Sequence, residues 1–261
     1  MKLKIVFANI SQGLIYEGSP GDNSVFSKCW PSKYVDFFED LSPDILCLAE
    51  APFETSNGDG KFVQQCSKDL SLPYYRTDTR EQSWIVEGLY YGTAIFSKFE
   101  IEKYEVVELL NPGIETIRPN GDVWKLHDKS VQKATLNING QRVDLFNLHY
   151  FPFTYFGRKF DDPEFASAHK FLEDIVTSGS NPAIVTGDFN NDGVEIEDIF
   201  QRLFSNNGYH RAVISSSSDS AGYLEKNQID HILVSENFKV SEHQVIRNYS
   251  DHPALVVDVE I

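Results

Sequence analysis

The sequence has few cysteines, no long apolar run and no recognisable export signal. Its three cysteines, Cys29, Cys47 and Cys66, are an odd number without CxxC spacing, which argues against a disulfide framework or a zinc ribbon. No stretch approaches the roughly 20 apolar residues of a membrane-spanning helix. The first residues, MKLKIVFANISQG, lack the apolar core and the small-residue cleavage site of a secretory signal. We therefore expect a reduced, cytoplasmic protein with no membrane span.

Basic residues are also in deficit. There are 23 Lys and Arg against 39 Asp and Glu, so the formal net charge is −16. This balance gives no long-range attraction for nucleic acid and excludes the basic architectural binders, so any contact with a polyanion must depend on a local site or on bound cations. The length of 261 residues and the 41% hydrophobic content are typical of a globular chain with a large core. We expect one domain over residues 1–261, and a monomer.

Short apolar segments alternate with helical patterns along the chain. Leu3–Ile10 and Asp44–Glu50 are predicted strands, because each is short, apolar and bounded by residues that break regular structure. The residues between them have apolar side chains on one helical face, at Tyr34, Phe37, Phe38 and Leu41. This alternation places helices against a sheet.

The second half of the chain begins with a hairpin. Val131–Ile138 and Arg142–Tyr150 are joined by Asn139-Gly140, the signal of a type I′ turn. Asp162 as N-cap and Pro163 as first residue then predict a helix that ends before Gly179. The remaining predicted elements are strands in AIVTGDFN, IDHILVS, FKVSEHQVI and ALVVDVEI, and a helix near residues 194–204. Many paired strands with a few helices predict mixed sheets with the helices outside, an α/β (α+β) fold.

Several predicted strands end on a polar side chain that is useful in catalysis. These residues are Asn9, Glu50, His149, Asp188 with Asn190, and the pair Asp251 and His252 just before the last strand. One such residue means little, since a carboxylate at a strand end usually caps a helix or meets water. Several together are informative, because charged groups rarely enter buried runs without partners and strand ends that meet at one sheet edge form a crevice.

The residue types narrow the chemistry of this crevice. Carboxylate and amide oxygens suit Mg²⁺ or Mn²⁺, whereas zinc prefers imidazole or thiolate ligands. Histidines beside such a cluster transfer protons or donate to developing oxyanion charge when a carboxylate holds each ring. A divalent cation would neutralise the acidic cluster and polarise the P–O bond of a phosphate. The pattern therefore predicts a hydrolytic site for phosphate esters.

The order of these motifs is similar to that of a known superfamily. AN at Asn9, LAE at Glu50, NLHY at His149, GDFN at residues 188–190, IDHILVS from Ile229 and SDHPALVV from Ser250 resemble, in order, the motifs of the endonuclease/exonuclease/phosphatase superfamily, whose members include deoxyribonuclease I-like metal-dependent phosphoesterases. The resemblance spans residues 3–259. It implies a four-layered αββα sandwich of two packed mixed β-sheets with outer helices, and an active site at one edge of the sandwich.

The resemblance also implies roles for single residues. Glu50 is expected as the principal ligand of Mg²⁺ or Mn²⁺, with Asn9 and Asp251 in the same metal site.

Five further residues are expected to be catalytic by the same resemblance. Asp188 orients or deprotonates the attacking water, and Asn190 positions the water and the phosphate. His252, held by Asp230, contacts the scissile phosphate. His149 protonates the leaving oxygen.

The other histidines carry weaker signals. Glu87 is a candidate partner for His149, although no spacing rule fixes this pair. His231 alternates to the opposite strand face from Asp230 and is expected to be structural. The remaining histidines, expected at the solvated surface, are His127, His169, His210 and His243.

The segment after His149 bears on the substrate. HYFPFTYFGRKF has six aromatic residues and two basic ones, and we expect Tyr155, Phe156 and Arg158 to bind substrate, since aromatics with cations stack bases and hold phosphates. The same side chains could instead cover the core or touch a lipid. The Ser215–Gly222 segment is expected to be a loop without a role.

Three functions remain open. A phosphodiesterase or nuclease acting on nucleic acid or nucleotide-linked substrates is favoured, because IDHILVS and SDHPALVV look most similar to nuclease-type members. The alternative is the same chemistry on a small-molecule or lipid phosphate ester, such as a sphingomyelinase-like or sugar-phosphate hydrolase, which the acidity favours. A catalytically inactive binding module is disfavoured, because no expected acidic or histidine position has been lost.

Overall fold

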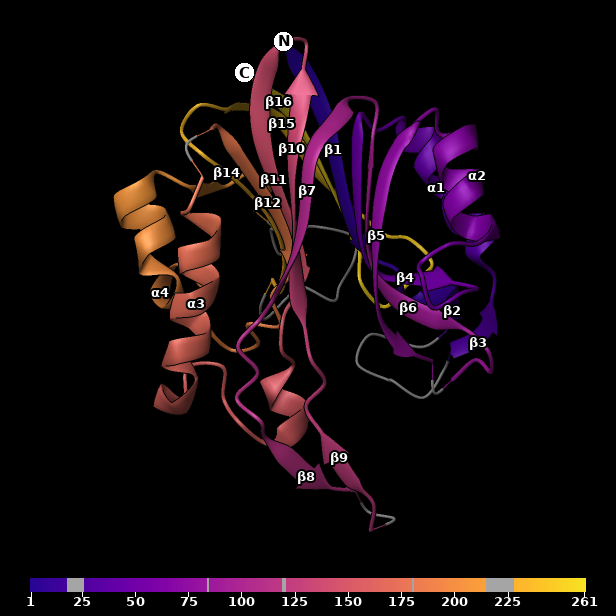
Figure 1. Cartoon of the computed structure of the whole chain (residues 1–261), viewed down its shortest axis with the longest axis vertical. Coiled ribbons are helices and arrows are strands. Elements are labelled where there is room, and N and C mark those ends of the chain that lie inside the picture. The colour runs from indigo at the N-terminus through magenta and orange to yellow at the C-terminus, as the bar shows by residue number, and fades with distance from the viewer. Residues whose placement is uncertain (18–25, 84, 119–120, 180, 215–227) are drawn as a thin grey trace.

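Two six-stranded sheets pack face to face, and helices cover both outer faces (Figure 1). The computed structural model describes residues 1–17, 26–83, 85–118, 121–179, 181–214 and 228–261. The Ser215–Gly222 segment therefore lies outside the described residues. This architecture confirms the αββα sandwich that the sequence predicts.

The first sheet is built mainly from the N-terminal half and completed by the C-terminus. Its order is β15 (Lys239–Ile246), β16 (Ala254–Glu260), β1 (Lys2–Asn9), β4 (Ile45–Phe53), β6 (Tyr90–Ser97) and β5 (Tyr74–Gln82). β1 and β4 are parallel, and their neighbours run antiparallel. The Met1 ammonium donates to the carbonyl oxygen of Ile261, so both termini lie at one end of the molecule (Figure 1).

The second sheet has the order β13 (His210–Arg211), β14 (Asp230–Val234), β12 (Ala183–Asp188), β11 (Gln141–His149), β10 (Ser130–Ile138) and β7 (Glu100–Glu108). β11 and β12 are parallel and the other pairs are antiparallel, so this sheet is mixed as well. The predicted hairpin is confirmed, and its turn residues Asn139 and Gly140 have φ of 52° and 91°, as a type I′ turn requires.

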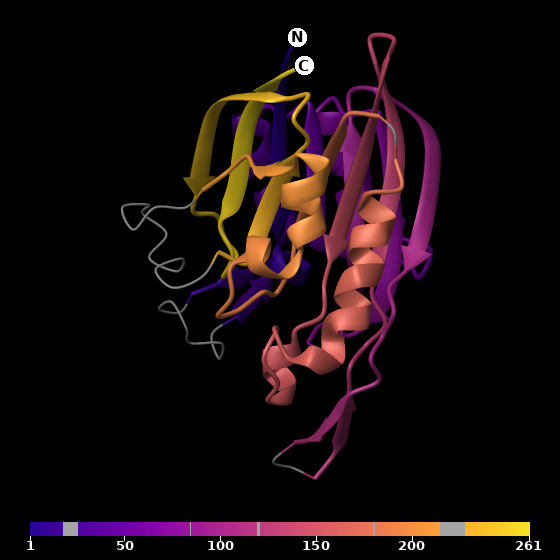
Figure 2. The ribbon, with the colours of Figure 1, turned by 90° about the vertical axis from the view of Figure 1, so that its left-hand side faces the viewer.

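The helices form the outer layers of the sandwich (Figures 1 and 2). α1 (Pro31–Leu41) and α2 (Lys61–Asp69) cover the first sheet, and α3 (Ala166–Val176) and α4 (Ile196–Ile199) cover the second. The short turns are η1 (Ser11–Gly13), η2 (Phe153–Phe156), η3 (Pro163–Phe165) and η4 (Arg202–Asn206). Within the described part of the chain, none of the helices has the length and apolar character needed to cross a membrane.

Two small hairpins stand outside the sandwich. β2 (Leu14–Tyr16) pairs with β3 (Phe26–Cys29) beside the first sheet. β8 (Glu115–Ile117) pairs with β9 (Val123–Lys125) in an arm that extends beyond the sheets, at the end opposite the termini (Figure 1).

Two predicted helices differ in detail from the observed ones. The helix predicted near residues 194–204 is divided into α4 and the wider turn η4. The apolar stripe before Gly179 is buried as expected, but its N-cap works differently: the Asp162 carboxylate accepts the Lys159 N–H (2.9 Å) and makes no side-chain cap bond to the helix. The sequence pattern identifies the position of this cap but not its hydrogen bond.

The core between the two sheets is mainly apolar, and Asn147 forms one of the polar links that cross it. Asn147 on β11 is fully buried, and its amide nitrogen donates to the carbonyl oxygens of Leu48 (3.1 Å) and Ala94 (3.2 Å) on the opposite sheet. It also donates to Gln132 Oε1, and its oxygen accepts the Thr186 hydroxyl at 3.0 Å. Because these bonds cross between sheets, they fix the position of one sheet against the other.

We expect Asn147→Ala to lower the free energy of unfolding by about 2–4 kcal/mol, because it opens a cavity and leaves buried carbonyl groups without a donor. Urea titration followed by circular dichroism measures this change. Asn237→Ala is the matched control, since Asn237 is exposed, and it should change stability by less than about 0.5 kcal/mol. Equal effects of the two substitutions would contradict the linking role of Asn147.

Candidate active site

The polar strand ends predicted from the sequence meet at one edge of the sandwich. The parallel strands β1, β4, β11 and β12 end there, and the antiparallel strands β14 and β16 begin there. The strand register pairs His149 with Asp188 and Asp188 with Asp230, so three of the expected residues are direct cross-strand neighbours. Sheet pairing alone therefore brings together three of the eight residues expected to be catalytic or to bind metal.

Asp188 is the centre of this group. It is 2% exposed, and its two oxygens accept the Asn9 amide (3.0 Å) and the Asn190 backbone N–H (2.9 Å). The ring nitrogens His149 Nε2 and His252 Nε2 lie 3.7 Å and 4.0 Å from Asp188 Oδ2. Burial and the neighbouring Asp230 carboxylate raise the pKa of Asp188 to about 7. A carboxyl with a pKa in this range is suited to accept a proton from water near neutral pH.

His252 and Asp230 form a buried pair. His252 Nδ1 lies 2.8 Å from Asp230 Oδ2, which is the orienting contact the sequence predicted. Burial alone would lower the pKa of His252, but the charge and hydrogen bond of Asp230 outweigh it, so this pKa lies well above its usual value. The raised pKa favours the protonated ring, and His252 Nε2 lies 4.0 Å from Asp188 Oδ2.

His149 has the opposite character. Burial first, then the charges of Lys129 and His252, hold the pKa of His149 well below its usual value, so its ring is neutral without substrate. The sequence offered Glu87 as its partner, but Glu87 is exposed in the turn between β5 and β6. The carboxylate that approaches His149 is that of Asp188 instead. The register of β11 with β12 explains the difference, and no spacing in the sequence reveals it.

Glu50 and Asp251 form the oxygen-rich side of the site. Glu50 lies in a β-bulge where the β4–β6 register shifts between Leu48 and Ala51, and its φ of 48° is unusual for a non-glycine residue. Burial raises the pKa of Glu50, Lys129 opposes this, and the nearby Asp251 carboxylate raises it further. Two carboxylates that repel each other in a buried setting favour a bound cation.

The donors at this position fit a hard divalent ion. Asp251 Oδ1 accepts the hydroxyls of Ser11 and Ser250, and the Gln12 amide bonds Glu50, so both carboxylates are held in place with oxygen atoms left for a ligand. Oxygen-only ligands of this kind suit Mg²⁺ or Mn²⁺. The Asn9 oxygen accepts the Ser11 N–H (3.0 Å), and the Asn9 amide nitrogen donates to Asp188 (3.0 Å).

A second set of ligand atoms lies nearby. One atom each from Asp188, Asp230 and His252 come within 4.8 Å of one another, and Asp230 Oδ1 is buried with no hydrogen-bond partner among the described residues. The structure thus offers two adjacent places for positive charge at the same sheet edge.

The aromatic segment after His149 is mainly core. Phe156 is 7% exposed and packs on Trp124 at 4.8 Å between ring centroids, so it has no free face for a base. Arg158 pairs with Glu164 (3.6 Å). Tyr155 is 59% exposed and stacks on Trp124 at 6.2 Å. Of the three expected binding residues, only Tyr155 offers a free ring.

The hydroxyl of Tyr155 lies on the side of the acidic cluster. Partial burial of the Tyr155 hydroxyl among neighbouring atoms is the main reason that its pKa is raised to about 12. The negative charges of Asp188, Glu50 and Asp251 raise this pKa further. The exposed ring therefore lies beside the site.

Two histidine predictions have different outcomes. His231 is buried, as its strand face predicts, and bonds Asn191 Oδ1 at 3.1 Å. His169 was expected at the surface and this was wrong: it is 6% exposed, lies among aromatic rings and contacts the Tyr150 hydroxyl and the Phe160 carbonyl. Its place on the buried side of α3 overrides its polar sequence context.

The sequence reasoning missed four residues that contact the site. Ser11 and Ser250 hold Asp251, and Gln12 holds Glu50. Lys129 is a buried cation whose charge acts on both Glu50 and His149. The serines and Gln12 lie next to recognised motifs and could have been found there, whereas Lys129 precedes β10 without any motif signal.

Comparisons with known proteins bear on the family and the fold of the chain. The model of the Endonuclease/Exonuclease/phosphatase family matches residues 9–252. No curated protein sequence matches the chain. An endonuclease/exonuclease/phosphatase from Beutenbergia cavernae has a TM-score of 0.72 and 15% identity over 100% of this chain and 72% of its own. The mannosyl-6-phosphatase of Bacteroides thetaiotaomicron has a TM-score of 0.62 and 18% identity over 99% and 100% of the two chains. The human nocturnin catalytic domain with bound sulfate has a TM-score of 0.62 and 18% identity over 99% and 93%. At these identities the likeness establishes the fold alone.

The buried His231 gives a pH-dependent stability that can be measured. Burial and then Arg211 lower the pKa of His231 to about 3, below its value of about 6.5 in an unfolded chain. Between these values the unfolded chain binds a proton that the folded chain does not, so stability falls as the pH is lowered from about 6.5. We expect His231→Gln to reduce this slope by up to about 1.4 kcal/mol per pH unit.

Urea unfolding at several pH values between 6.5 and 4 measures the slope for each variant. The exposed His243, changed to Gln, is the matched control. If the free energy of unfolding changes with pH equally steeply in His231→Gln and in wild type, the His231 ring is not buried in its neutral form.

Proposed function

Because this chain belongs to the endonuclease/exonuclease/phosphatase family, whose members are phosphoesterase hydrolases, we propose that the site at the sheet edge hydrolyses phosphate esters by in-line attack of an activated water, with Mg²⁺ or Mn²⁺ as cofactor. The family is generally dependent on a divalent metal. The observation that carries the proposal is the buried Asp188, whose carboxylate lies 3.7 Å from His149 Nε2 and 4.0 Å from His252 Nε2.

A divalent ion held by Glu50 and Asp251 would stabilise negative charge on the phosphate oxygens. In this mechanism Asp188 accepts a proton from the attacking water, and the amide of Asn9 holds its carboxylate in position. The His252 imidazolium donates to a nonbridging oxygen while Asp230 keeps its ring oriented.

His149 and Asn190 complete the machinery. The His149 ring is neutral without substrate, but the negative charge of a phosphate opposes the effects that lower its pKa, so the ring can take up a proton and deliver it to the leaving oxygen. The Asn190 amide nitrogen donates to the Tyr150 carbonyl oxygen (3.1 Å), and its φ of 52° is unusual for a non-glycine residue. This contact fixes the Asn190 oxygen for positioning water.

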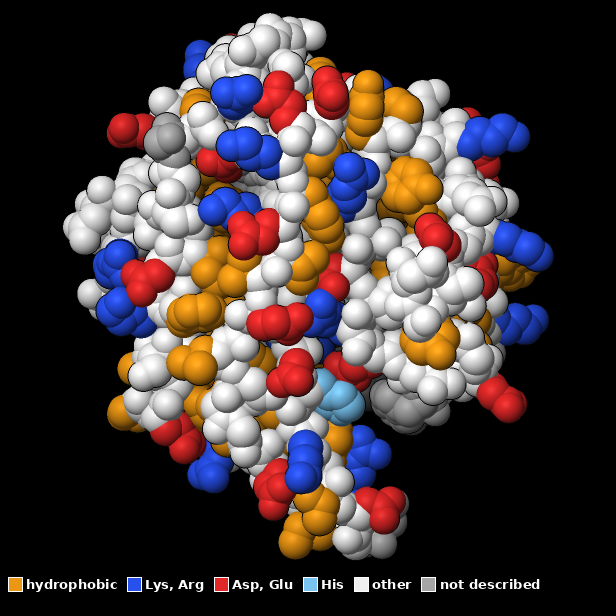
Figure 3. Space-filling view, in the orientation of Figure 1, with side chains coloured by type: hydrophobic (Ala, Val, Ile, Leu, Met, Phe, Trp, Pro, Cys, Tyr) orange, Lys and Arg blue, Asp and Glu red, His pale blue; other side chains and the backbone are white. Residues whose placement is uncertain are grey.

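The substrate class that the geometry supports best is a compact phosphate ester. Phe156 is buried and Arg158 is paired, so the loop offers little for a long polyanion. Figure 3 shows acidic and basic side chains interspersed over one face of the molecule, and the whole chain has a net charge of −16. Without a continuous basic surface on that face, a polymer gains little from counterion release.

A nucleotide-linked phosphodiester is the second candidate. It is favoured by the exposed Tyr155 ring stacked on Trp124, because such a pair accepts a base by stacking. The discriminating experiment is a Mg²⁺-dependent hydrolysis screen of sugar phosphates, dinucleotides, oligonucleotides and sphingomyelin. If the protein hydrolyses none of these esters, the proposed function is contradicted.

We expect Glu50→Gln to raise the Mn²⁺ concentration for half-maximal activity about tenfold or more, because it removes one charged ligand and keeps the shape of the side chain. Activity against metal concentration after chelation measures this change. Glu100→Gln, at an exposed position on β7, is the matched control. Full wild-type turnover after exhaustive chelation would refute the metal mechanism.

We expect Tyr155→Ala to raise KM for a dinucleotide about five- to a hundredfold if the ring stacks a base, while bis(4-nitrophenyl) phosphate is hardly affected. Tyr74→Ala, at an exposed position on β5, is the control. Equal losses on both substrates together with a lower Tm would assign Tyr155 to packing and remove the second candidate.

A further inference from the structure

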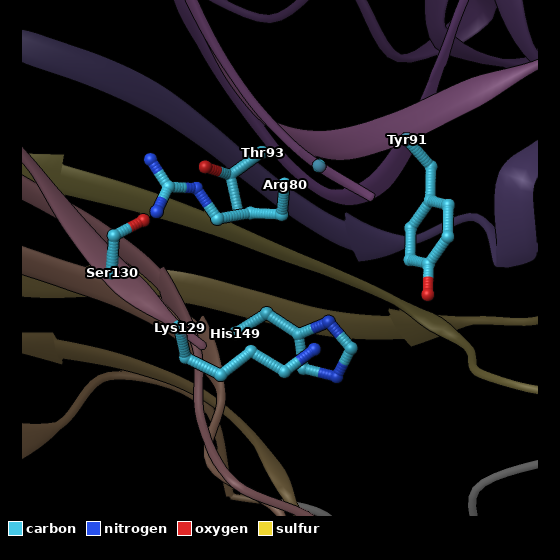
Figure 4. A pocket seen from close by; sticks show the side chains of 7 residues that line it. Arg80, Tyr91, Thr93, Lys129, Ser130 and His149 are labelled. Carbon is cyan, nitrogen blue, oxygen red and sulfur yellow. The ribbon is translucent and has the colours of Figure 1, made fainter. Parts of the chain in front are cut away.

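A small pocket adjoins the catalytic group on the His149 side. It is small and partly open to solvent, and it is lined by Arg80, Tyr91, Gly92, Thr93, Lys129, Ser130 and His149. β5 and β6 of the first sheet form one wall, and the start of β10 and the end of β11 form the other. Figure 4 shows Lys129 and His149 side by side in this pocket, with Arg80, Thr93 and Ser130 gathered near them and the Tyr91 ring opposite. His149 thus belongs both to the catalytic group and to the pocket.

A β-bulge shapes one wall of this pocket. The β5–β6 register places Thr79 opposite Gly92 and Glu81 opposite Tyr91, so Arg80 is the extra residue of the bulge. A Cβ at Gly92 would lie 1.9 Å from the Asp78 carbonyl oxygen, so only glycine fits opposite the bulge. The bulge therefore depends on Gly92, and it places Arg80 in the pocket wall.

The pocket has unfilled hydrogen-bonding groups of both kinds. Thr93 is 3% exposed and its hydroxyl has no partner among the described residues, and the same holds for Arg80 Nε. Lys129 is 7% exposed, and its ammonium comes only within 3.7 Å of Glu81 Oε1, which also lacks a hydrogen bond in the described part of the chain. Buried polar groups without partners are costly, so this pattern indicates a ligand that supplies both acceptors and donors.

The charges around the pocket argue against an anionic ligand. Arg80 is paired with Asp78 and with both oxygens of Glu108, which lie 2.8 Å from Nη1. Glu81 faces Lys129 and also accepts the Tyr91 hydroxyl. Two cations therefore face three carboxylates.

His127 adds to the same network, because its Nδ1 lies 2.9 Å from Glu81. A second phosphate would meet carboxylates already in place, whereas a neutral hydroxyl group both donates and accepts. Hydroxyl groups can therefore accept from Arg80 Nε and Lys129, and they can both donate to and accept from the Thr93 hydroxyl.

We propose that this pocket binds hydroxyl groups of the leaving alcohol, so that the substrate is the phosphate ester of a neutral polyol, such as a sugar. The inference rests on the proposed phosphoesterase function, because His149 then places the pocket on the leaving-group side of the scissile bond. Thr93 and Lys129 are the specificity-determining residues. The hydroxyls of a bound sugar complete the hydrogen bonds that are unfilled in the free protein.

A matched pair of esters tests this proposal. The 6-phosphates of glucose, mannose, galactose and fructose carry ring hydroxyls, whereas cyclohexylmethyl phosphate has a similar ring without them. With Mg²⁺, we expect kcat/KM for the best hexose ester to exceed that for cyclohexylmethyl phosphate at least about tenfold, which corresponds to one or two buried hydrogen bonds.

Thr93→Val keeps the shape of the side chain and removes the hydroxyl. It should lower this preference about three- to tenfold, mainly through KM, while cyclohexylmethyl phosphate is hydrolysed as before, and Thr93→Ser should restore it. Lys129→Met should also reduce the preference. Lys125→Met, on the exposed β9 strand, is the matched control and should leave the preference intact.

Each outcome decides the proposal. A best hexose ester within threefold of cyclohexylmethyl phosphate would overturn it. So would a preference for glucose 1,6-bisphosphate that depends on Lys129, because the pocket would then bind an anion. If no phosphate ester is hydrolysed, saturation-transfer NMR with the four free hexoses, compared with cyclohexanol, tests the pocket separately. Hexose signals that are present in wild type and disappear in Thr93→Val would support the pocket, although the proposed function would have failed. Absence of hexose signals in wild type would refute the pocket.

Discussion

The buried carboxylate of Asp188 is the group on which the site depends. Asp188 belongs to the second sheet, yet it accepts a hydrogen bond from Asn9 at the end of β1 in the first sheet. The position of one sheet against the other therefore affects the geometry of the candidate site. A carboxylate at 2% exposure is unfavourable without compensation, and two histidines, an asparagine amide and a backbone N–H provide it. The Asn147 link between the sheets and the site itself thus require the same packing of one sheet on the other.

Irregular backbone places the side chains that regular strands cannot. Glu50 and Arg80 both lie at bulges in strands that flank β6, and each is turned toward the edge where the catalytic strands end. Glu50 and Asn190 both have positive φ, which is uncommon for a glutamate and more readily adopted by an asparagine. The core of the surrounding sheets is apolar.

The sequence was sufficient for the layers of the fold and for identifying most of the polar strand ends that meet at one edge, because strand periodicity and strand-end residues are local signals. It was not sufficient where tertiary contacts decide. Phe156 is an aromatic residue of the kind that stacks on bases, but it packs on Trp124. Glu87 is exposed in the turn between β5 and β6, and the carboxylate that approaches His149 is that of Asp188. Lys129 and Arg80 carry no motif, and only the approach of β5, β6 and β10 to β11 makes them neighbours of the site. Arg80 Nε and the neighbouring Thr93 hydroxyl lack hydrogen-bond partners among the described residues, a feature that a sequence does not record.

The most direct test of this account is the turnover of wild type and Asp188→Asn on one phosphate ester with saturating Mg²⁺, measured together with the Tm of each protein. Because the substitution keeps the shape of the side chain and removes a buried charge, the account predicts a kcat lower by about three orders of magnitude or more and a Tm that is unchanged or higher. A kcat within tenfold of wild type in the folded Asp188→Asn protein would contradict the central role of this carboxylate.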